Sequence, residues 1–219
     1  MKMPQNFKEI LAENAVIGMV IPDAKYDEML INAAGNLGKE YNKILYISIN
    51  KPYKKLVGKF KQNHINPDKF YFIECITRTA GDVNSTENCI YVSSPKASDE
   101  IKTAIFDVFR KQEIDVALID SPSVLSTYYE HTDVLKLMHL LMTKLDVAEC
   151  KGIFPFQKES ASPLRRSIEM FTDKTVYLES AKSGYSNADS GVNLGVKVDK
   201  MILFALRKII NRNPLGYSI

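Results

Sequence analysis

Short apolar runs alternate with longer amphipathic segments along most of the chain. Runs rich in β-branched and aromatic residues predict buried strands at residues 15–21, 43–49, 69–74, 88–92, 114–119, 150–156 and 175–179, with 88–92 at an edge. Apolar residues at helical spacing predict helices at 23–39, 51–63, 98–112, 131–147 and 163–171. Asp23 is the predicted N-cap of the first helix. Such alternation predicts a mainly parallel sheet covered by helices on both faces.

The last forty residues give a less regular pattern. Residues 180–191 are polar and contain glycine, which predicts a loop, and the alternation of apolar and polar residues over 192–198 predicts a half-exposed strand. Residues 200–211 fit a helix, with a strand as the alternative. No Pro/Gly/Ser-rich linker divides the chain, so we expect a single domain over residues 1–219.

Composition changes this picture little. The chain has 219 residues, 45% of them hydrophobic, and a formal net charge of +3. This balance does not favour wholesale binding to nucleic acid or membranes. The N-terminal segment lacks an apolar core of signal-peptide length, and no apolar run approaches the roughly 20 residues that span a bilayer. We therefore expect a cytoplasmic protein.

The candidate reactive side chains are scattered. Cys75, Cys89 and Cys150 form no CxxC pair and lie in or beside apolar runs, which predicts buried, reduced thiols and no metal site. His131 and His139 are two helical turns apart, too far to share a metal without other ligands. Ser121, His131 and Asp133 supply the residue types of a nucleophilic triad, but no G-x-S-x-G elbow surrounds the serine.

Three segments in order, KILYISINKPYKKL, VALIDSPSVLSTY and VKVDKM, carry a family resemblance. Together they resemble the RecA/KaiC-type ATPases, in particular the archaeal KaiC-like group, over roughly residues 15–200. The second segment is similar to the Walker B strand of that family, with Asp120 as its aspartate. The resemblance implies an α/β fold, a RecA-like three-layer α/β/α sandwich with a mainly parallel central sheet.

The turn after the first strand departs from that family. A phosphate-binding loop needs glycines for inward-facing amides, and a Lys followed by Ser or Thr. Here the segment is IPDAKYDEML, without glycine, and Pro22 lacks an amide donor. Asp23, Asp27 and Glu28 put negative charge where a triphosphate would lie, and only Lys25 opposes them. We therefore expect no ATP cofactor.

The residues for hydrolysis depart as well. The family places a glutamate after the second strand, where this chain has Asn50 and Lys51, and neither can act as a carboxylate base. Asp120 remains, and we expect it to cap the following turn, with a ligand or metal contact as the alternative. In the third segment no arginine follows Lys200 and Met201, so the family's role in a neighbouring subunit is not transferred to Lys200.

Basic residues gather in two places. The segment 51–61 carries Lys51, Lys54, Lys55, Lys59 and Lys61, a solvated helix face or a phosphate-binding stripe. The segment KESASPLRR contains Arg165 and Arg166, which together with Lys54, Lys55 and Lys59 form the candidate nucleic-acid surface. The loop 180–191 has Lys182 as its one basic residue.

These observations predict a non-catalytic RecA/KaiC-like protein that regulates or scaffolds by binding proteins, either an active RecA/KaiC-type ATPase or itself. One alternative is an enzyme or sensor that holds another small molecule where the strands end. The residues of that candidate cleft are Asp23, Lys25, Asn50, Lys51, Tyr53, Asp120 and Ser121. The other alternative is a nucleic-acid-binding accessory factor.

Overall fold

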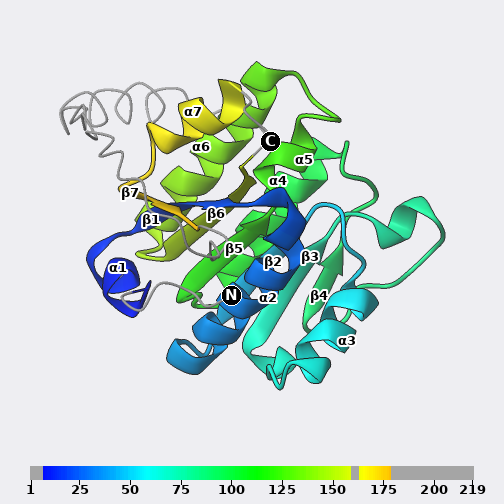
Figure 1. Cartoon of the computed structure of the whole chain (residues 1–219). Coiled ribbons are helices and arrows are strands. Elements are labelled where there is room, and N and C mark those ends of the chain that lie inside the picture. The colour runs from blue at the N-terminus through cyan, green and yellow to red at the C-terminus, as the bar shows by residue number, and fades with distance from the viewer. Residues whose placement is uncertain (1–6, 159–162, 179–219) are drawn as a thin grey trace. The chain divides into compact units, whose positions relative to one another are not determined.

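A parallel β-sheet forms the centre of the computed structural model, which describes residues 7–158 and 163–178 (Figure 1). Among these residues seven strands pair in the order β4-β3-β2-β5-β6-β1-β7, and every pair is parallel. The strands are β1 (Val16–Ile21), β2 (Ile44–Ser48), β3 (Phe70–Glu74), β4 (Cys89–Tyr91), β5 (Val116–Asp120), β6 (Lys151–Gln157) and β7 (Lys174–Tyr177).

Helices cover both faces of the sheet (Figure 1). One hydrophobic core lies between the sheet and α1 (Phe7–Glu13), α2 (Tyr26–Glu40) and α3 (Tyr53–Gln62). The other lies between the sheet and α4 (Ser98–Lys111), α5 (Pro122–Leu125), α6 (His131–Val147) and α7 (Pro163–Glu169). The fold is therefore an α/β, RecA-like three-layer α/β/α sandwich, and this prediction is confirmed.

Alternation along the strands divides the side chains between the two cores. In β2, Tyr46 packs in the core under α2 and α3, while Leu45 and Ile47 pack in the core under α4 and α6. Because both faces are covered, every residue of β1, β2 and β5 is buried. Gly152 allows α6 to approach β6 closely, since a Cβ there would lie 2.6 Å from Leu145 Cδ1.

Within the described residues the predicted strands and helices are confirmed to within a few residues, and β4 lies at the edge of the sheet. The predicted cap of the first helix is wrong. Pro22 precedes a short 3-10 helix, Asp23–Lys25, and α2 begins only at Tyr26. The Lys25 amide donates to the Pro22 carbonyl at 2.9 Å, so this tight turn delays the α-helix by three residues and removes Asp23 from the capping position.

Three predictions fall outside the described residues: the loop 180–191, the strand 192–198 and the segment 200–211. The prediction of one domain over residues 1–219 also extends beyond them. In the part of the chain that is described, no helix is both long and apolar enough to cross a membrane.

The connections diverge where the parallel strands end. The chain leaves β1 and β2 toward α2 and α3 on one face of the sheet, but it leaves β5 and β6 toward α5, α6 and α7 on the other. Loops that turn to opposite faces leave a crevice outside the carboxyl ends of the strands between them. The crevice of this fold is therefore expected above β1, β6, β5 and β2.

Candidate functional site

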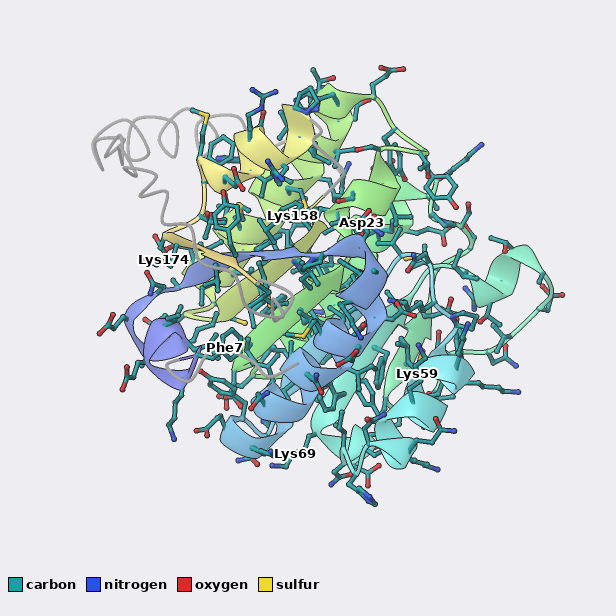
Figure 2. The ribbon with its side chains drawn as sticks, viewed as in Figure 1. Phe7, Asp23, Lys59, Lys69, Lys158 and Lys174 are labelled. Carbon is teal, nitrogen blue, oxygen red and sulfur yellow. The ribbon has the colours of Figure 1, made fainter. Side chains whose placement is uncertain are left out.

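A cleft of about 450 Å³ lies at this place. The residues that line it follow β1, β2 and β5 or end β6: Asp23, Ala24, Tyr26, Asp27, Glu28, Asn50, Lys51, Ser121, Val124 and Gln157. Figure 2 shows Asp23 at this end of the sheet and Lys69, which precedes β3, at the opposite end. The cleft is thus built from the strand ends that the topology brings together.

The carboxylate of Asp120 lies at the end of β5 and is fully buried. Lys51 Nζ lies 2.7 Å from its Oδ2, and the Tyr46 hydroxyl donates to the same oxygen at 2.9 Å. The Tyr26 hydroxyl lies 3.4 Å from the other oxygen, Oδ1. The aspartate is therefore surrounded by donors of the chain itself.

The Lys51 ammonium joins two carboxylates. Besides Asp120, it contacts Asp27 Oδ1 at 3.0 Å, and it lies 5.4 Å from the centre of the Tyr26 ring. Its side chain is only 13% exposed. The Ser48 hydroxyl bonds both the amide and the carbonyl of Lys51, at 3.2 and 2.8 Å, which fixes the turn after β2. The turn therefore holds the ammonium between the ends of β1 and β5.

Burial and the neighbouring charges shift the pKa values of the residues in this network. Burial raises the pKa of Asp120, although Lys51 and Tyr46 favour its charged form. Burial raises the pKa of Tyr46 and Tyr26 well above the usual value, and the neighbouring Asp120 charge adds to this. Burial also acts to raise the pKa of Asp27, but hydrogen bonds from Lys59 and Lys51 outweigh it, so the pKa is lowered. Both tyrosines are therefore neutral donors.

The cleft offers an entering anion little attraction. Asp23, Asp27 and Glu28 line it, whereas Lys51, the one cation among the described residues that line it, already contacts two carboxylates. Within residues 7–158 and 163–178 no group of three or more His, Cys, Asp or Glu side chains is arranged to hold a metal ion. The arrangement favours an internally neutralised polar site over phosphate chemistry.

The structure brings together five of the seven predicted cleft residues. Asp23, Asn50, Lys51 and Ser121 line the cleft, and Asp120 contacts Lys51. The other two do not line it. Lys25 pairs with Glu28 at 3.0 Å, and the ring of Tyr53 packs against Phe72 and Tyr91, with centroids 5.0 and 6.2 Å away.

The predicted capping role of Asp120 is wrong. Ser121 precedes α5, and its side chain makes no capping hydrogen bond, while the Asp120 carboxylate accepts from Lys51 and Tyr46. The reason is the neighbourhood of the strand end, since Lys51 and Tyr46 already donate to this buried carboxylate. The peptide bond between Asp120 and Ser121 is cis.

The candidate nucleic-acid residues lie on two faces of the molecule. Lys54, Lys55 and Lys59 belong to α3, and Arg165 and Arg166 belong to α7, which covers the opposite face of the sheet. Lys59 pairs with Asp27 at 3.0 Å. These five residues therefore do not form one continuous surface.

The triad residues are engaged elsewhere. His131 Nε2 lies 3.5 Å from the hydroxyl of Ser167, and Asp133 pairs with Lys136 at 3.0 Å. Neither contact involves Ser121, which lines the cleft. The arrangement gives no support to a hydrolase mechanism based on Ser121.

The three cysteines are free and buried, as predicted. Burial raises the pKa of Cys89 and of Cys150 to about 12, and it raises that of Cys75 further. These thiols are therefore protonated at neutral pH and are poor nucleophiles or metal ligands.

Sequence reasoning missed the aromatic part of the site. Tyr46 lies in the predicted strand 43–49 and Tyr26 in the predicted helix 23–39, and both pack in the core between the sheet and α2 and α3, near Asp120. A tyrosine at a buried position needs a partner for its hydroxyl, which was an available signal. Asp27 was considered only as a repulsive charge, but its position one helical turn after Asp23 placed it at the same strand end.

A second buried carboxylate, Glu74 at the end of β3, was also missed. Its Oε1 accepts hydrogen bonds from the amides of Ile76 and Thr77, the latter at 2.8 Å. Its other oxygen has no hydrogen-bond partner among the described residues. A glutamate closing the apolar run FYFIE was the signal for a buried carboxylate.

Comparison of the chain with protein-family models gave no match, and comparison with curated proteins gave none either. The function is therefore inferred from the residues of the site.

Proposed function

We propose that the chain is a non-catalytic, RecA/KaiC-like protein that regulates or scaffolds by binding other proteins, without using ATP. The observation that carries the proposal is the contact of 2.7 Å between the Lys51 ammonium and the buried Asp120 carboxylate. In P-loop ATPases an aspartate at the end of a strand holds Mg²⁺ together with the phosphates. Here a cation of the chain itself contacts that carboxylate.

Displacing Lys51 would be unfavourable. Its ammonium is mostly buried and contacts Asp27 as well as Asp120, so a metal–phosphate group entering the site would have to separate a buried ion pair. Removing one partner from a buried pair leaves an uncompensated charge in a poorly solvated place. The internal pair therefore acts against Mg²⁺ and nucleotide binding.

The turn after β1 also disfavours nucleotide binding. It contains no glycine, Pro22 has no amide hydrogen, and the α-helix begins only at Tyr26. Asp23, Asp27 and Glu28 line the cleft beside this turn. A triphosphate would meet carboxylates where it needs a ring of amides.

Binding to proteins is the role that we favour for a RecA-like sandwich with such a site. The family resemblance suggests the kind of partner, an active RecA/KaiC-type ATPase or a second copy of the chain, by analogy of fold. Exposed surface, and not the strand-end cleft, then carries the function.

Thermal unfolding with and without millimolar Mg-ATP tests the claim that the chain does not bind nucleotide. We expect an unchanged Tm, because a ligand that does not bind the native state cannot stabilise it. An increase of several degrees would contradict the proposal. Affinity purification from the native host, with and without nucleotide depletion, tests the protein part: the same partners should be recovered in both conditions.

The cleft supports a second candidate function, a sensor or enzyme for another small molecule. It has the volume of a small-ligand site, about 450 Å³, and its carboxylates would favour a cationic or neutral polar ligand. NMR spectra of the chain with pooled cationic metabolites test this candidate. Shifts confined to the cleft, at Asn50, Lys51 and Ser121, would support it over the first.

A further inference from the structure

Helix α3 contains a glycine that its own domain does not require. Gly58 lies in the middle of the helix, where glycine is less favourable than alanine. A Cβ at this position would meet no atom of the described residues within 4 Å, and the residue does not have a positive φ. Neither close packing nor backbone conformation within the domain therefore explains the glycine.

Gly58 is at the centre of the outer face of α3. Lys54 and Lys55 precede it by four and three residues, and Lys61 follows it by three, so all three share its side of the helix. The two buried residues of the helix, Leu56 and Phe60, are each two residues away and point into the core. We call the surface of Lys54, Lys55, Gly58 and Lys61 the Gly58 face.

The Gly58 face carries uncompensated positive charge. Residues 51–66 contain five lysines and no acidic residue. Lys51 and Lys59 both contact Asp27. Lys59, which is labelled in Figure 2, belongs to α3. Lys54, Lys55 and Lys61 are exposed and make no ion pair with the described part of the chain. Three ammonium groups thus surround a partly exposed position that carries no side chain.

We propose that the Gly58 face binds an acidic α-helix of a protein partner, whose backbone packs over Gly58 while its carboxylates contact the three lysines. A missing Cβ lets two backbones approach closely, and the surrounding charges orient the partner and exclude basic ones. This inference rests on the proposed protein-binding role and names its surface.

The composition of α3 favours a protein partner over nucleic acid. The helix has no arginine, the residue suited to forked contacts with phosphate. Its two aromatic residues point inward: Phe60 is fully buried, and Tyr53 packs against Phe72. No aromatic ring on this helix is therefore available to stack on bases, as in single-stranded nucleic-acid sites.

The substitution Gly58→Ala separates binding from folding because its two effects have opposite signs. In the isolated chain alanine should raise the Tm by roughly 2–4 °C, since it favours the helix and meets no neighbour. Against a helix packed on Gly58 the added methyl should weaken binding by about tenfold. Gly81→Ala is the matched control, because a Cβ there also meets nothing within 4 Å, but Gly81 is outside α3.

The probe is a capped peptide of about 20 residues, long enough to form a helix, with Glu on one face and Ala on the adjoining face. Titration into the ¹⁵N-labelled full chain should shift the amides of residues 53–62. Binding should weaken at least about tenfold in the triple variant Lys54→Glu, Lys55→Glu, Lys61→Glu, and should fall with added salt. It should be unchanged in Lys111→Glu, an exposed lysine of α4 on the other side of the sheet.

Two outcomes would overturn the inference. If Gly58→Ala binds the peptide as tightly as the wild type, no helix packs over Gly58. If a uridine oligomer binds the Gly58 face more tightly than the peptide does, the partner is a nucleic acid. Either result is compatible with the proposed function as long as proteins still co-purify after nucleotide depletion. Stabilisation of the chain by Mg-ATP, in contrast, would contradict the proposed function but not the binding of a helix to the Gly58 face.

Discussion

Asp120 and Glu74 are two buried carboxylates at the ends of β5 and β3, which flank β2 in the sheet, and different kinds of group contact them. Asp120, at the end of β5, contacts an ammonium and a tyrosine hydroxyl from elsewhere in the chain. Glu74, at the end of β3, accepts from two amides that directly follow it. A strand-end carboxylate alone is thus no evidence of catalysis, because the groups that satisfy it decide its role.

The difference also separates long-range from local stabilisation. Lys51 and Tyr46 are 69 and 74 residues from Asp120 in the sequence, so their contacts require β2 beside β5. The amides that bind Glu74 are two and three residues away and form with the turn itself. The contacts of Asp120 therefore form only in the assembled sheet, whereas the contacts of Glu74 depend on one loop.

The substitution Lys51→Met tests the Asp120 network, for which we expect the largest effect. It leaves the fully buried Asp120 without its cation, and we expect the free energy of unfolding to fall by about 3–5 kcal/mol. Urea unfolding measures this change.

Lys59→Met is the matched control for that substitution. It removes the same charge and also breaks a contact with Asp27, but that pair is exposed, so a loss of only about 0–1 kcal/mol is expected. Equal losses in the two variants would mean that the Lys51–Asp120 pair contributes no more than a surface pair, and the main support for a closed site would be lost.

The end of β3 should respond less. Glu74→Ala removes the acceptor of the Ile76 and Thr77 amides, and we expect a loss of about 1–3 kcal/mol in urea unfolding. Glu74→Gln keeps an acceptor oxygen, and no ammonium contacts Glu74 in the described residues, so a loss below about 1 kcal/mol is expected. Equal losses for Gln and Ala would show that the charge, and not the acceptor oxygen, matters here.

The sequence predicted the fold well because its signal is local. Buried parallel strands are apolar throughout, so each run between two amphipathic helices could be recognised separately, as in 114–119 and 131–147. The turn at Pro22 was less visible, because a 3-10 turn and a helix start share the same residue types.

The site could be predicted only in part, because its pairing is not local. Asp120 and Lys51 both follow apolar runs and were recognised as strand-end residues. That they neutralise one another depends on which strands are neighbours, and hydrophobic periodicity carries no information on strand order. Tyr46 was missed for the same reason, since its hydroxyl has a partner only once β5 lies beside β2.

The pH dependence of stability gives the most specific test of how the Asp120 network is balanced. Burial raises the pKa of Asp120 in the folded state, whereas in the unfolded chain it is ordinary, about 3.9. Between these two values the folded state binds the proton more tightly, so this group stabilises folding increasingly as pH falls through the raised pKa.

We therefore expect the wild type to gain stability relative to Asp120→Asn as pH falls from neutral toward about 4, by at most about 1.4 kcal/mol per pH unit. Asp27, whose pKa is lowered, loses its contribution at the acid end, and because it shares Lys51 with Asp120, both proteins are compared in an Asp27→Asn background. Urea unfolding of both proteins at each pH measures the difference. A wild type that loses stability relative to Asp120→Asn on acidification would mean that Lys51 and Tyr46 outweigh burial, and that Asp120 is held as a charged group more firmly than its buried position implies.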